Sequence, residues 1–274
     1  VLGGLRDRWI PLLFPNTTDI FKDVIRSQNE ISTFYPPNAP AEVIEGHKVI
    51  SELTATTFWD NSAQIEMLMS VISPGVISIQ SALQHPYSRG RVYINSTDPF
   101  DPIIIDPNYY SHPADRTIMR QGVKLVRQVG AAFGELLGPE TNPGPGVQTD
   151  EQIDEWLTNQ GAGTQYHPAS SCAMLPRKWG GVVDADLKVY GLANVRVIDS
   201  SVIPFEFAAH LASATFGVAE MGSELVRRGS YEVPRGARAD DKDLGTGGDS
   251  GAVSMRVAVG AVGVGVMSFV GLLL

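Results

Sequence analysis

The feature that most constrains the fold of this chain is the alternation of two hydrophobic periodicities along it. Apolar residues recur at helical spacing over residues 118–137, 150–160 and 211–226. Short runs rich in β-branched residues lie between Gly, Pro, Asn and Asp at residues 91–95, 103–105, 187–190 and 195–198. Because helical and strand patterns are interspersed, the sequence predicts an α+β fold.

Two of the predicted helices carry recognisable boundary signals. Pro113, between Ser111 and Asp115, marks the start of the first. Thr149 and Gln152 have the spacing of a capping box at the start of the second, and Gly161 is expected to end it. Beyond residue 228 the chain becomes rich in Gly, Arg and Asp, which indicates a solvated linker.

Charge and cysteine content exclude several functional classes. The chain has 274 residues, 43% of them hydrophobic, enough for one large domain or two smaller ones. Its net charge of -9 repels phosphate backbones, so a nucleic-acid partner is not expected. Cys172 is the single cysteine, so neither an intrachain disulfide nor a cysteine zinc cluster can form.

The C-terminal tail points to a membrane surface. Residues 257–274 are uncharged and rich in Gly, Val and Leu, and they follow Arg256 and a run of small residues. This pattern predicts a GPI-attachment signal, hence a secreted, cell-surface protein, with a single-span tail anchor as the alternative. Sequons at Asn16 and Asn95 would accept glycans on that route. Because the chain starts at Val1, we expect a fragment.

The densest chemistry lies in three C-terminal motifs, GTQYHPASSCAM at 163–174, VRVIDSSVIP at 195–204 and AAH at 208–210. Upstream, PYSRGRV at 86–92 is followed by DPNY at 106–109 and by Asp115. In this order the motifs resemble the C-terminal signature of glucose-methanol-choline oxidoreductases, in particular fungal glucose-oxidase-like and aryl-alcohol-oxidase-like members. The resemblance covers about residues 80–228.

The resemblance implies how the chain is organised. Residues 1–155 would form part of a substrate-binding domain with an antiparallel sheet and helices, and residues 156–230 the segment that returns to an α/β FAD-binding domain. Residues 231–274 would be the linker and tail. The Rossmann-like unit with its glycine loop would lie N-terminal to this sequence, since the glycine clusters present here lack the strand and helix that such a loop needs.

Two histidines are the candidate catalytic residues. Oxidation of an alcohol needs a base that titrates near neutral pH at the hydroxyl. His167 precedes Pro168, which favours an extended or loop conformation, and His210 is expected in the first turn of the last helix, where the dipole favours a neutral ring. The resemblance implies that both rings face the flavin, with His167 as principal acid/base. His47, His85 and His112 lie outside the matched positions.

The resemblance further implies an FAD cofactor contacted by Asp199, Ser200, Ala209 and Ala212, where backbone amides at a turn and a helix start can donate hydrogen bonds. No metal is expected. The substrate would be an alcohol or a sugar and the electron acceptor oxygen or a quinone, with oxidase and dehydrogenase both open. Two alternatives remain: a non-catalytic, surface-anchored remnant that cannot hold FAD, and a serine hydrolase, against which the absence of a Gly-x-Ser-x-Gly elbow speaks.

Overall fold

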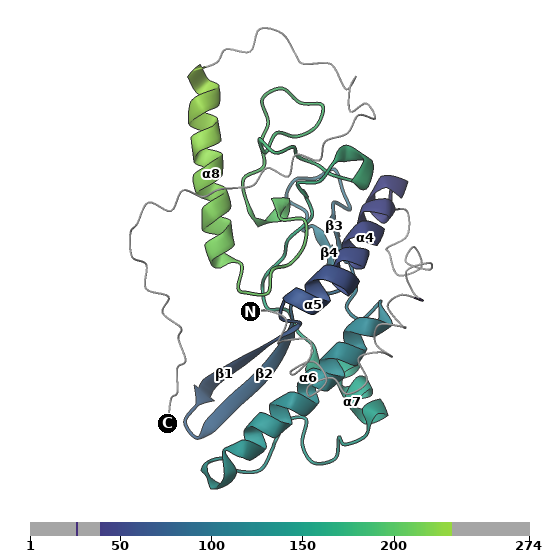
Figure 1. The fold of residues 1–274 in the computed structure, drawn as a ribbon, viewed down its shortest axis with the longest axis vertical. Coiled ribbons are helices and arrows are strands. Elements are labelled where there is room, and N and C mark those ends of the chain that lie inside the picture. Colours follow the sequence, from purple (N-terminus) through teal and green to yellow (C-terminus); the bar gives the residue numbers. More distant parts are fainter. Residues whose placement is uncertain (1–25, 27–38, 232–274) are drawn as a thin grey trace. The chain divides into compact units, whose positions relative to one another are not determined.

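The computed structural model describes Arg26 and residues 39–231 (Figure 1). The helices in this part are α4 (Ala41–Leu53), α5 (Trp59–Asn61), α6 (Pro113–Ala132), α7 (Asp150–Trp156) and α8 (Ala212–Tyr231). The strands are β1 (Ile65–Ser73), β2 (Val76–Leu83), β3 (Arg91–Tyr93) and β4 (Ile104–Asp106). Short helical turns are η2 (Thr54–Phe58), η3 (Gly134–Leu136), η4 (Leu157–Gly161), η5 (Arg177–Trp179) and η6 (Ser200–Val202). The mixture of helices and small antiparallel sheets confirms the α+β prediction.

The hairpin of β1 and β2 was not predicted. The strands pair antiparallel, with Ile65 opposite Leu83, and turn at Gly75, whose φ of 78° suits glycine. Helix α6 packs along this hairpin (Figure 1). At Gly122 a Cβ atom would lie 2.8 Å from Ser81 Oγ, so a larger residue there would force the Ser81 side chain or α6 to shift. One face of the hairpin is mainly apolar and the other mixes polar with apolar residues, so the period of two used to recognise strands is incomplete.

Helix α6 confirms a predicted helix but with different ends. His112 is the N-cap, where its Nδ1 accepts a hydrogen bond from Ala114 N at 3.2 Å, and Pro113 is the first helical residue. The helix ends at Ala132, so Leu137 lies outside it. The apolar spacing continues past the end of the helix, over the short turn η3, so the pattern by itself does not mark where the helix ends.

Helix α7 has the predicted capping box. Thr149 Oγ1 accepts from Gln152 N at 3.3 Å, and Gln152 Oε1 accepts from Thr149 N at 3.0 Å. Ile153 and Leu157 are buried against Val123 of α6. The helical segment continues through η4 to Gly161, as predicted.

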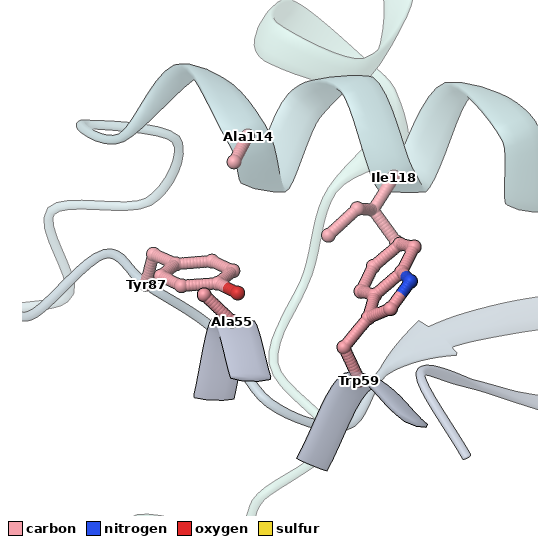
Figure 2. Close-up of a cluster of buried hydrophobic side chains, with 5 residues drawn as sticks. All are labelled: Ala55, Trp59, Tyr87, Ala114 and Ile118. Carbon is pink, nitrogen blue, oxygen red and sulfur yellow. The ribbon is translucent and has the colours of Figure 1, made fainter. Parts of the chain in front are cut away.

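A hydrophobic core joins the α4–α5 region to α6. Ala55, Trp59, Tyr87, Ala114 and Ile118 form a buried cluster. Figure 2 shows the indole of Trp59 against the side chain of Ile118, with the ring of Tyr87 between Ala55 and Ala114. This cluster connects residues far apart in sequence, and it places the loop after β2 beneath the start of α6.

The C-terminal region corrects one prediction. Residues 187–190 and 195–198 were expected to form strands, but they form only isolated bridges, Val183 with Val189 and Lys188 with Arg196. Their Val189, Val197 and Ile198 instead pack against a small buried core under α8 that consists of Val183, Leu187 and Val202. The helix predicted at 211–226 is confirmed as α8.

The predicted tail signal at 257–274, the linker and the sequon at Asn16 lie outside the described residues. Asn95 is exposed in the loop after β3. Within residues 39–231 no helix combines the length and the apolar character needed to cross a bilayer. The proposed boundary at residues 155/156 stays a prediction.

Candidate active site

His167 lies in the loop that follows η4, as the neighbouring Pro168 predicted, and it is half-buried. The residue before it, Tyr166, has a φ of 60°, and its backbone N–H donates to Thr164 Oγ1 at 2.9 Å. A left-handed conformation at a non-glycine residue is uncommon and costs about 1–2 kcal/mol. Strained turns of this kind cluster at functional sites, so the loop geometry fits a role for the adjacent imidazole.

His210 lies in the turn that precedes α8, which begins at Ala212. The prediction that His210 belongs to the first helical turn was therefore wrong, because residue 211 still forms part of the connecting turn. Its side chain is 51% exposed, and its Nε2 lies 3.1 Å from Glu66 Oε1. The ring is thus oriented by a carboxylate on the hairpin.

The structure brings the two predicted histidines together. Their ring centroids lie 4.7 Å apart, and the rings meet edge to face at 89°. Backbone hydrogen bonds hold their segments side by side: Cys172 N donates to Ser201 O at 2.9 Å and Met174 N to Val202 O at 2.8 Å. Both imidazoles can therefore reach one small group.

Two residues of this site were missed by the sequence analysis. Glu66 lies on β1, and Gln84 directly follows β2. Gln84 Nε2 donates to Glu66 Oε2 at 3.3 Å, which leaves Oε1 for His210. Strand alternation would have placed Glu66 on the other face of the strand from its apolar neighbours Ile65 and Met67. No local pattern, however, indicates that its partner is His210, which is distant in sequence.

The four residues predicted to contact FAD gather near the start of α8. Asp199 Oδ1 accepts from Ser201 N at 2.8 Å and caps η6, while Ser200 Oγ lies 2.6 Å from Thr215 Oγ1 of α8. Ala209 and Ala212 are exposed. Their small side chains permit close approach to a helix start, where backbone N–H groups lack intrahelical acceptors. These residues fit a flavin nucleotide, and their contact with it stays a prediction.

The remaining described histidines have structural contacts. His47 Nε2 contacts Tyr87 O at 2.9 Å, and burial lowers the pKa of His47 to about 3. Burial likewise lowers the pKa of His112, the N-cap of α6, to about 4. His85 is buried between two hydrogen-bond partners described below. Among residues 39–231, no group of three or more His, Cys, Asp and Glu side chains could hold a metal ion.

A wide groove of about 2610 Å³ runs past this site. His167 and Ala209 line it, together with Gln84, Arg89 and Glu206. The groove gives a small molecule access to the loop of His167 and to the turn before α8.

Comparison with known proteins identifies relatives along most of the chain. A family model described as GMC oxidoreductase matches residues 86–219. The GMC oxidoreductase family protein Mala s 12 of Malassezia sympodialis is 41% identical over 217 residues, which cover 78% of this chain and 34% of that protein. The present chain thus spans about a third of the length of that relative.

Solved structures agree with this assignment. A fungal aryl-alcohol oxidase superposes with a TM-score of 0.72 at 25% identity, covering 81% of this chain and 38% of that one. An FAD-dependent oxidoreductase from Chaetomium thermophilum gives a TM-score of 0.69 at 24% identity, with the same coverage of 81% and 38%. The second match supports the fold alone.

Proposed function

This chain belongs to the GMC oxidoreductase family, whose members are oxidoreductases of alcohols and sugars, and we propose that it supplies the proton-transfer site of such an enzyme. The reaction would oxidise a CH–OH group, with FAD as cofactor and oxygen or a quinone as final acceptor. The observation that carries the proposal is the His167–His210 pair, with ring centroids 4.7 Å apart.

The contacts of His210 support a role in proton transfer. An ionised Glu66 carboxylate can only accept, so the proton of a neutral His210 lies on Nε2 and its Nδ1 is left as an acceptor. A substrate hydroxyl group beside the ring pair can then donate to either imidazole. In the proposed mechanism His167 accepts the hydroxyl proton at a ring nitrogen, and His210, held by Glu66, packs against the His167 ring and positions it.

FAD, when bound, would accept the hydride that leaves the substrate carbon. Asp199, Ser200, Ala209 and Ala212 are the residues proposed to hold it. The small exposed side chains of the two alanines favour close approach of a flat ring to the turn before α8. The chain's own contribution to the chemistry is therefore the placement and protonation of the two histidines.

A spectroscopic and kinetic experiment tests this function. The protein should show flavin absorbance in the visible range, and an alcohol should bleach it without oxygen. His167→Ala should retain the flavin and lower the rate of bleaching by about 100-fold or more, the usual effect of losing a general acid/base. Absence of flavin would favour the alternative of a non-catalytic remnant, and a loss below about 10-fold would make His167 structural.

We also propose attachment to the outer cell surface through a GPI anchor, on the basis of the apolar residues 257–274. A phospholipase C that cleaves GPI anchors should release the protein from intact cells. A single-span tail would keep it in the membrane after that treatment.

A further inference from the structure

Glu206 is a carboxyl group at the active-site groove that the mechanism above does not use. It is half-buried, it lines the groove together with His167, and it lies between Phe205 and Phe207. Within residues 39–231 its carboxyl oxygens have neither a hydrogen-bond nor an ion-pair partner. Carboxyl groups withdrawn from water are normally paired, so an unpaired one beside a groove is available to a ligand.

The fold holds Glu206 by its backbone and leaves the side chain unused. His85 Nδ1 contacts Glu206 O at 3.0 Å, and His85 Nε2 contacts Ser62 Oγ at 2.9 Å. Burial lowers the pKa of His85, so the ring is neutral: Nδ1 donates to the carbonyl and Nε2 accepts from the hydroxyl. His85 also stacks on Phe58 at 5.1 Å. The carboxyl group is thus presented from a rigid support.

The charges around Glu206 restrict the ligand. Arg89 lines the same groove and is anchored by hydrogen bonds from Nη1 to Pro86 O at 2.6 Å and Ser88 O at 3.0 Å. Its charge disfavours a cationic ligand, while the carboxylates of Glu206 and Glu66 disfavour an anionic one. A purely apolar alcohol would leave Glu206 desolvated without a partner. A neutral molecule with several hydroxyl groups satisfies all three conditions.

Distance along the chain limits the size of that molecule. Glu206 precedes His210 by four positions, which span at most about 14 Å in an extended chain. This upper bound is of the order of the length of a sugar or a short polyol, so one such molecule can present its reacting hydroxyl group to the histidine pair and a second hydroxyl group toward Glu206, which lines the same groove as His167.

We propose that Glu206 is the substrate-selecting residue of this site, whose carboxylate accepts a hydrogen bond from a second hydroxyl group of a polyhydroxy alcohol. This inference rests on the proposed function. Burial raises the pKa of Glu206 to about 7, against the opposing effect of Arg89, so its acceptor strength should increase across neutral pH.

Kinetics of the flavin-loaded protein test the proposal. Pairs with the same carbon skeleton are compared, hexan-1-ol with sorbitol and cyclohexanol with myo-inositol. Glu206→Leu should lower kcat/KM for the polyols by about 10- to 100-fold, mainly through KM, and leave the monohydric alcohols unchanged. Glu206→Gln, which keeps the shape and one acceptor, should fall between. Glu155→Leu, at an exposed position of α7, is the matched control and should leave kcat/KM unchanged for both the polyols and the monohydric alcohols.

Equilibrium binding separates the two proposals. Titration calorimetry on the His167→Ala protein should show tighter binding of the polyol than of its monohydric partner, and Glu206→Leu in that background should abolish the difference. The role of Glu206 is overturned if the polyol and its monohydric counterpart bind the His167→Ala protein equally well. It is also overturned if the difference in affinity persists after Glu206→Leu. Selective binding without turnover in the parent protein would uphold Glu206 and overturn the proposed chemistry.

Discussion

Two polar clusters in this molecule are built in opposite ways. The Asp115 cluster consists of Asp115, Ser88 and His112, and it is buried beneath the start of α6. Asp115 accepts from Tyr87 N at 2.8 Å and from Ser88 N at 2.7 Å, and Ser88 Oγ accepts from His112 N at 3.0 Å. The second cluster, at the candidate active site, consists of His167, His210, Glu66 and Glu206, which are only partly buried or exposed.

The difference shows which polar groups serve the fold. Both carboxylate oxygens of Asp115 have backbone donors, whereas the carboxyl group of Glu206 has no partner among residues 39–231. Satisfied buried groups hold one arrangement because any rearrangement exposes an unpaired donor or acceptor. Groups with spare hydrogen-bonding capacity can exchange water for a ligand. Substitutions in the Asp115 cluster should therefore lower the stability of the protein, whereas substitutions in the second cluster should lower its activity.

The largest effect is expected from Asp115→Asn. The amide group would place a donor against one of the two backbone N–H groups at a buried position, and should lower the free energy of unfolding by about 3 kcal/mol. Urea denaturation measures the change.

Asp98→Asn is the matched control on the exposed β3–β4 loop. Asp98 Oδ1 accepts from Phe100 N at 2.9 Å, the same kind of bond in contact with solvent. There the loss should be about 0.5–1 kcal/mol. Equal losses at both positions would show that burial does not distinguish the two clusters.

A smaller effect, confined to activity, is expected from Glu66→Gln. The amide keeps the shape but weakens the hydrogen bond to His210 Nε2, and it should lower kcat by about 10-fold, equivalent to one bond to a charged group. KM and the unfolding midpoint should stay the same.

Glu45→Gln removes a carboxylate partner of Lys48 on the exposed face of α4 and should leave kcat unchanged. A Glu66→Gln protein that lost stability together with activity would place Glu66 among the structural residues, contrary to the contrast drawn between the clusters.

The smallest effect is a slope in pH. Folding holds the pKa of His112 at about 4, below its ordinary 6.5, so between these values the unfolded chain binds a proton that the folded chain does not. Stability is full above pH 6.5 and falls as the pH falls, by up to about 1 kcal/mol per pH unit. His112→Asn keeps an N-cap acceptor and should make the slope shallower between pH 6 and 5. An unchanged slope would show that His112 does not contribute.

Local signals predicted elements wherever the interactions are local. The capping box of Thr149 and Gln152 lies within one helical turn, so sequence spacing was sufficient to locate α7. Residues 187–190 and 195–198 have strand composition but lack a neighbouring strand along their length, so tertiary packing under α8 replaced a sheet. The β1–β2 hairpin was missed because apolar residues interrupt its more polar face, which weakens the period of two.

The motifs by themselves predicted the family, the α+β class and the two candidate histidines, because these depend on residue type and order along one C-terminal stretch. Only the tertiary structure decided that the imidazoles meet edge to face and that Glu66 contacts one of them. Those contacts join the hairpin to loops more than a hundred positions away. The distance between such groups is set by the packing of α6 and α8 on their cores, and no local pattern encodes it.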